Sequence, residues 1–212
     1  ALRAPSEHPE SALPAHVQKL VRPAALQKAT KLAFLRFEKA DLDAAQRFWT
    51  DFGLITVSRT PEQLVMRGAG AEPALLMARQ SPRPRFVGAA FVVPADTDFE
   101  RLQRDSGARP LSPEAVPGGA RGVSLIDPDG HEVWLITDWP EVAPLPLRQP
   151  THANINALGQ TMRVNATVRT PIEAAAVARL GHVVLQTTDF HAMADWYMRH
   201  LGLLPSDVQY LE

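Results

Sequence analysis

The sequence contains no cysteine among its 212 residues, and this absence removes several kinds of chemistry at once. Disulfides, thiolate metal sites and cysteine nucleophiles are all excluded. Any metal bound by this chain must therefore be held by imidazole and carboxylate groups. The formal net charge of -1 gives no general electrostatic reason to expect a nucleic acid or an anionic membrane as a partner.

Long apolar runs are also missing. No stretch approaches the length that crosses a membrane, and the N-terminus lacks the charged-then-apolar layout of a signal peptide, so a cytoplasmic location is expected. The chain starts at Ala1 rather than Met, which suggests a processed or missing true start. With 45% hydrophobic and 21% charged residues, the composition indicates a globular protein of one large domain or two small ones.

Proline, glycine and the apolar pattern divide the chain into four parts. Residues 1–30 form an N-terminal extension with one short helix near Val17, residues 31–139 a first domain, residues 140–178 a proline-rich and polar linker, and residues 179–212 the start of a second domain. In the first domain a strand at 31–38 precedes a helix that Asp41 caps and Gly53 ends. The helix has an apolar stripe at Ala44, Ala45, Phe48, Trp49 and Phe52.

The remaining elements of the first domain complete this unit and then repeat its order. Strands are expected at residues 63–67, 74–78, 86–93, 122–126 and 132–137, and a helix at 97–106. Asp127 to Gly130 (DPDG) has the composition of a hairpin turn. The pattern predicts β-α-β-β twice, with room for one weaker strand in each half.

Residues 179–189 (RLGHVVLQTTD) align with residues 31–41 (KLAFLRFEKAD), which indicates an internal repeat. Both segments read as a strand followed by a helix cap, an aromatic pair and a Gly-Leu ending. The aromatic pair is Phe48-Trp49 in the first copy and Trp196-Tyr197 in the second. The Gly-Leu ending is Gly53-Leu54 in the first copy and Gly202-Leu203 in the second. The second copy stops after one strand and one helix.

These elements, with the DPDGHEVWL hairpin, resemble the βαβββ unit of the vicinal oxygen chelate superfamily. That superfamily includes glyoxalase I, bleomycin- and fosfomycin-resistance proteins and extradiol ring-cleaving dioxygenases. A second module opening with RLGHVVL is most similar to the two-domain extradiol catechol dioxygenases. The resemblance implies an α+β fold of tandem βαβββ modules, the second incomplete, and covers residues 31–212.

The resemblance also implies where a metal would bind. Ligands in this superfamily come from the first strand of a module and from the strand after the DPDG turn; the first module has Phe34 and Trp134 there and is expected to be structural. The second module has His182 at the position of Phe34. By resemblance His182 is one of two histidines and a glutamate that hold Fe(II), the other two lying beyond Glu212. On the residues alone, a core histidine satisfied by a hydrogen bond explains His182 better.

Other polar residues carry weaker signals. His131 is expected to be solvent-exposed in the turn, and Glu132 is out of register with Trp134. His191 and His200, nine residues apart, are expected to be surface or packing residues. Asp189 reads as a helix cap, and Trp49, Trp196 and Tyr197 read as core aromatics. Arg163, Arg169 and Arg179 could form a basic strip, but a solvated linker explains them equally well. The remaining histidines in irregular segments are His8, His16 and His152.

Three functions follow from the resemblance. The leading one is an Fe(II)-dependent extradiol dioxygenase acting on a catechol-type aromatic compound and O2. The alternatives are a glyoxalase-like metalloenzyme, against which Phe34 and Trp134 count, and a metal-free protein that sequesters a ligand. An incomplete module leaves apolar sheet faces uncovered, which favours disorder or association, for example into a homo-oligomer. The sequence is therefore expected to be a fragment, a cleavage product or a chain with an unobserved tail, and to have no oxygenase activity of its own.

Overall fold

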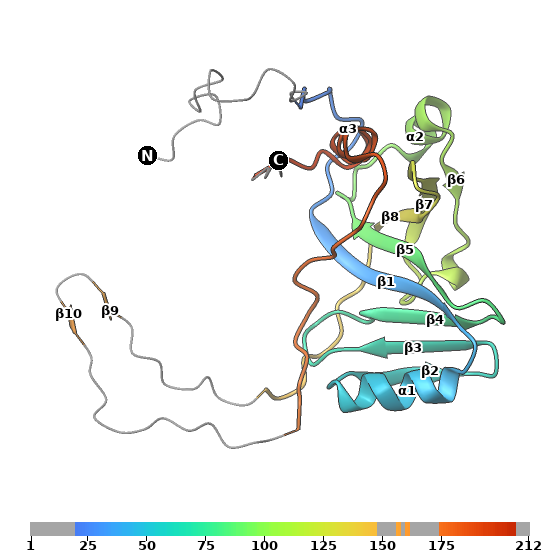
Figure 1. Ribbon diagram of the computed structural model, residues 1–212, viewed down its shortest axis with the longest axis vertical. Coiled ribbons are helices and arrows are strands. Elements are labelled where there is room, and N and C mark those ends of the chain that lie inside the picture. The colour runs from blue at the N-terminus through green and yellow to red at the C-terminus, as the bar shows by residue number, and fades with distance from the viewer. Residues whose placement is uncertain (1–19, 148–155, 158–159, 162–173, 207–212) are drawn as a thin grey trace.

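The computed structural model describes residues 20–147, 156–157, 160–161 and 174–206 (Figure 1). The expected helix near Val17 and most of the N-terminal extension lie outside these residues, as does most of the linker. So do five residues weighed above, namely His8, His16, His152, Arg163 and Arg169. Within the described ranges, no helix has the length and apolar character needed to cross a membrane.

The first domain consists of two successive βαβββ units. The first unit contains β1 (Lys31–Lys39), α1 (Leu42–Asp51), β2 (Ile55–Arg59), β3 (Gln63–Arg67) and β4 (Leu76–Gln80). The second contains β5 (Arg85–Val92), α2 (Phe99–Ser106), β6 (Arg109–Pro110), β7 (Arg121–Ile126) and β8 (Glu132–Thr137), with a short 3-10 turn at Pro113–Ala115. The α+β fold of βαβββ units is thus confirmed, and β2 and β6 are the weaker strands for which the sequence left room.

The two units join through their first strands into one sheet. The strand order is β2-β3-β4-β1-β5-β8-β7-β6, in one eight-stranded sheet. At its centre β1 and β5 are antiparallel, whereas β1 pairs with β4 and β5 with β8 in parallel. Each half of the sheet therefore repeats the other around the β1–β5 seam, which places the first strand of each unit at the middle of the molecule.

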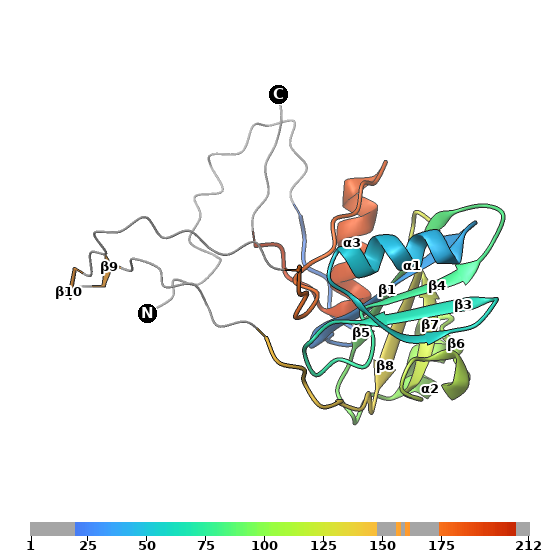
Figure 2. The same ribbon diagram turned by 90° about the horizontal axis from the view of Figure 1, so that it is seen from below.

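Helices cover one face of this sheet. α1 packs on the half containing β3 and β4, while α2 packs on the half containing β7 and β8. In both views these two helices lie at different ends of the sheet (Figures 1 and 2). The opposite face carries a second core made largely of β-strand side chains, including Phe34, Val65, Met77 and Trp134. Successive side chains of a strand point to opposite faces of the sheet, so both faces of the sheet are buried.

The apolar stripe of α1 is narrower than predicted. Leu42, Ala45 and Trp49 are buried, but Phe48 is 65% exposed and Phe52 is 63% exposed. Including the two phenylalanines in the buried stripe was therefore wrong. On a helix of 3.6 residues per turn, positions 48 and 52 lie to one side of the face formed by 42, 45 and 49, so the two rings stack on each other at the surface.

The expected strand of the second module is absent. Residues 179–188 run without regular secondary structure, whereas the helix after them forms as α3 (Phe190–Leu201). A strand forms only where a neighbouring strand satisfies its backbone groups, and none of the described strands pairs with this segment. The caps of α3 were predicted correctly: the Asp189 carboxylate accepts a hydrogen bond from the Ala192 amide at 2.9 Å, and Gly202 ends the helix with φ 65°.

α3 packs on the same face of the sheet as α2. Leu201 is fully buried in the core that contains Phe91 and Leu102. The amides of Leu26 and Ala29 donate to the carbonyls of Arg199 and Leu201, both at 2.7 Å. The stretch after residue 20 therefore runs beside α3 and ties its C-terminal end to the first domain. Two short strands, β9 (Asn156–Ala157) and β10 (Gln160–Thr161), pair within the predicted linker.

Candidate functional site

The two ligand positions of the first domain are filled by aromatic packing. Phe34 is 0% exposed, and its ring meets that of Trp134 edge-on, with centroids 6.1 Å apart. Trp139 closes the other side of Phe34 at 5.9 Å. Aromatic pairs in this geometry add to the free energy of burial. Neither position offers a ligand atom, and core packing accounts for both residues.

Glu132 forms an ion pair beside this aromatic cluster. The buried Arg36 guanidinium donates to the Glu132 carboxylate at 2.8 Å and lies 3.5 Å from the centre of the Trp134 ring. Burial lowers the pKa of Arg36, and the bond to Glu132 opposes that shift. Glu132 therefore neutralises a buried cation, and no local pattern predicts this contact between residues 96 positions apart.

His182 lies where two hollows meet. The larger hollow has a volume of about 560 Å³ and the smaller about 480 Å³, and the exposed His182 side chain lines both. Small-molecule sites in proteins are typically of this size and are mostly apolar. The larger hollow is lined mainly by apolar side chains, among them Leu32, Phe91, Val183, Leu185, Phe190, Met193 and Leu203. The prediction of His182 as a metal ligand stays a prediction, but the residue is accessible rather than packed in a core.

His131 is less exposed than predicted. Its side chain is 23% exposed, packs on the ring of Phe86 with centroids 5.3 Å apart, and lines the smaller hollow together with His182. Its Nδ1 lies 3.0 Å from the Asp127 carboxylate. The expectation of a solvent-exposed residue holds for Pro128, Asp129 and Gly130 of the turn but was wrong for His131, because its ring packs on Phe86 and its Nδ1 contacts the buried Asp127 carboxylate.

Asp127 is a polar residue whose contact with α3 was not predicted from the sequence. Its side chain is 0% exposed, and its carboxylate accepts hydrogen bonds from the Tyr197 hydroxyl at 3.1 Å and from His131. Burial, and then the nearby Asp127 charge, raise the pKa of Tyr197. The DPDG motif indicated a turn, but nothing in the local sequence indicated a tyrosine 70 residues later.

The two histidines of α3 make packing contacts. His191 meets the ring of Phe190 edge-on at 5.6 Å. His200 stacks on Trp196 with centroids 4.5 Å apart, and its Nδ1 donates to the Trp196 carbonyl at 2.9 Å. Burial lowers the pKa of His200. These contacts agree with the prediction that both are surface or packing residues.

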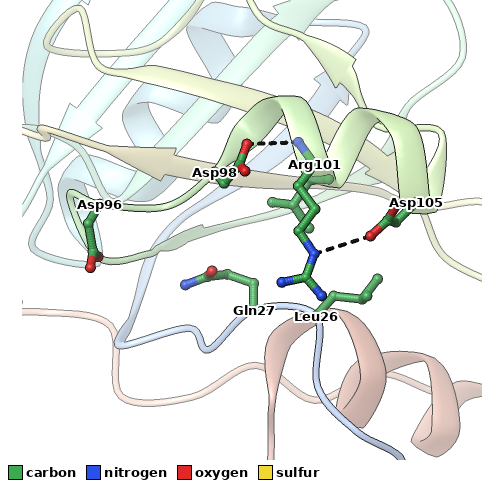
Figure 3. A pocket seen from close by; sticks show the side chains of 7 residues that line it. Leu26, Gln27, Asp96, Asp98, Arg101 and Asp105 are labelled. Atoms are coloured by element: carbon green, nitrogen blue, oxygen red, sulfur yellow. Dashed lines mark hydrogen bonds and ion pairs between the residues drawn. The ribbon is translucent and has the colours of Figure 1, made fainter.

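A third, acidic hollow of about 190 Å³ lies between α2 and the N-terminal stretch (Figure 3). The Asp98 carboxylate caps α2 by accepting from the Arg101 amide at 2.8 Å, and the Arg101 Nε donates to Asp105 at 3.2 Å. Of the three aspartates that line this hollow, Asp96 takes part in neither contact. Within the described residues no group of three or more histidine, aspartate or glutamate side chains is arranged to hold a metal ion.

The paired βαβββ units and their single curved sheet are the fold of the vicinal oxygen chelate superfamily. Solved structures with this architecture include the Mn(II)-bound glyoxalase from Novosphingobium aromaticivorans, with a TM-score of 0.51 and 23% identity over 58% of this chain and 44% of that one. Homoprotocatechuate 2,3-dioxygenase from Brevibacterium fuscum, in complex with 3,4-dihydroxyphenylacetate, gives 0.52 and 18% over 60% of this chain and 42% of that one. These structures confirm the predicted fold.

Among curated proteins, metapyrocatechase 2 from Cupriavidus necator is 31% identical over 172 residues, which are 80% of this chain and 51% of that protein. The chain thus spans about half the length of this relative. No family model matches the sequence. Metapyrocatechase 2 and the solved dioxygenase agree with the predicted resemblance to the vicinal oxygen chelate superfamily, and the solved structures also include a glyoxalase.

Proposed function

We propose that this chain is part of an Fe(II)-dependent extradiol dioxygenase that cleaves a catechol-type aromatic compound with O2. The observation that carries the proposal is the position of His182, in an RLGHVVL segment that opens onto two hollows. The similarity to metapyrocatechase 2 supports it, since this similarity extends over 172 residues, well beyond a single motif.

The residues present fit one ligand of such a centre. His182 offers an exposed imidazole, and no complete ligand set occurs in the part of the chain that the structure describes. When bound by two histidines and one carboxylate, Fe(II) keeps adjacent positions open for a catecholate and O2. Within this chain, the apolar wall that includes Phe91 and Met193 would receive a ring face and exclude water from it.

A glyoxalase-like metalloenzyme is the second candidate, since a Mn(II)-bound glyoxalase shares the fold. By the family resemblance, such enzymes often assemble their site between modules, with ligands from both. The corresponding positions of the first domain are Phe34 and Trp134, which are buried and have no ligand atom. This observation favours the dioxygenase.

The test is an assay on the complete product of the gene, loaded anaerobically with Fe(II). Addition of catechol and air is expected to produce a yellow ring-fission product with one O2 consumed per catechol. The hemithioacetal of methylglyoxal and glutathione serves as the comparison substrate. Isomerisation of the hemithioacetal without ring fission would support the glyoxalase candidate and contradict the proposal.

A further inference from the structure

The Asp127 carboxylate joins two parts of the chain that are far apart in sequence. One oxygen accepts from the backbone amides of Asp129 at 3.0 Å and His131 at 2.8 Å, which closes the DPDG turn. The other accepts from His131 Nδ1 at 3.0 Å and from the Tyr197 hydroxyl at 3.1 Å. A fully buried carboxylate requires such donors, so all four contacts stabilise its charge. Only the last one reaches α3.

Both side-chain contacts of Asp127 use the carboxylate as an acceptor. Because burial and the Asp127 charge raise the pKa of Tyr197, its phenol keeps the proton that it donates to the carboxylate. With the carboxylate ionised, the contact at His131 Nδ1 is a donation from the ring, since a carboxylate oxygen can only accept. Asp127 is therefore bound on one side by the turn and on the other by a helix of the second module.

Tyr197 and His131, the two side-chain donors to Asp127, also line the hollows around His182. Tyr197 lines the larger hollow with His182, and His131 lines the smaller one with it. The segment that carries His182 has no regular secondary structure, and it leads directly into α3 through the cap at Asp189. The position of α3 therefore determines where this segment can lie.

We propose that Asp127, acting through Tyr197 and His131, is a positioning group that holds α3 and the His182 segment against the first domain. The first domain then has a specific task in the enzyme: its DPDG turn orients the segment that supplies the ligand. Asp127 is not a catalytic residue, because its carboxylate is buried behind the two donors. The inference rests on the proposed role of His182 as a metal ligand.

The test uses the complete gene product without metal, and compares Tyr197→Phe, Asp127→Asn and the double variant. Thr187→Val is the matched control, because Thr187 also lines the larger hollow and its hydroxyl binds the Asp189 amide rather than Asp127. In Tyr197→Phe, the amides of α3 should exchange hydrogen roughly tenfold faster, as expected for loss of a bond to a charged acceptor.

A positioning role also predicts effects that a general loss of stability does not. The ring NMR resonance of His182 should shift in Tyr197→Phe and in Asp127→Asn by similar amounts, and the double variant should shift little further. Thr187→Val should add its own effect independently. An unmoved His182 resonance and unchanged exchange in Tyr197→Phe would overturn the positioning role. Tyr197→Phe keeps this test valid even if Asp127→Asn does not fold.

Metal titration separates this inference from the proposed function. Fe(II) should bind roughly tenfold more weakly to Tyr197→Phe, as with other residues that orient a ligand. If His182→Ala binds Fe(II) as tightly as the unaltered protein, the proposed function is wrong, and the Asp127 contact is then a structural link alone.

Discussion

Replacing Phe34 with alanine tests whether the first domain depends on aromatic packing where related modules have a metal ligand. Phe34 is 0% exposed and contacts Trp134 and Trp139. Truncation of a phenylalanine in such a core removes its transfer free energy and leaves a cavity, at a cost of about 3–5 kcal/mol. Phe34→Leu, which retains most of the volume, should cost about 1–1.5 kcal/mol.

The assay is urea unfolding followed by tryptophan fluorescence, because Trp134 and Trp139 report directly on this core. Phe48→Ala is the matched control: it makes the same chemical change at a side chain that is 65% exposed. Its cost should lie within about 0.5 kcal/mol of zero. Equal losses at positions 34 and 48, or a loss below about 1 kcal/mol at 34, would refute the reasoning.

Two further predictions concern charge. Because burial lowers the pKa of His200 in the folded protein, its contribution to stability is present above the ordinary pKa of 6.5 and is lost as the pH falls. The free energy of unfolding should therefore decrease between pH 7.5 and 5.5 by more in the unaltered protein than in His200→Gln, and equal decreases in urea unfolding would contradict this. Glu132→Ala should cost about 1–3 kcal/mol, because it leaves the Arg36 cation buried without a partner. Arg36→Met should cost less in the same assay, since the Glu132 carboxylate is 37% exposed and can be hydrated; the reverse order would be evidence against a buried-cation penalty.

Local signals predicted the local structure well. The caps at Asp41 and Asp189 and the DPDG hairpin depend on contacts within four residues, so the sequence shows both partners. Most strand positions followed from alternation for the same reason. β2 was harder to find because it is a short edge strand whose two apolar residues, Ile55 and Val57, are partly exposed.

Features that depend on distant partners were not predictable in this way. The apolar pattern of a helix does not show which of its residues contact the sheet, so it wrongly predicted Phe48 and Phe52 in the buried stripe. The pattern of residues 179–185 favours a strand but cannot supply the neighbour that a strand needs. The contacts of Asp127 with Tyr197 and of Arg36 with Glu132 join residues 70 and 96 positions apart. His182 was identified only through its register with Phe34 in the repeat and through family resemblance.

The central claim is that metal-dependent chemistry belongs to the module that begins with His182. The most direct measurement is the iron content and ring-fission rate of the complete gene product carrying His182→Ala, with His191→Ala as the control histidine on the following helix. We expect loss of bound iron and of the yellow product in His182→Ala, and retention of both in His191→Ala. Full iron content and activity in His182→Ala would contradict the proposed role of His182.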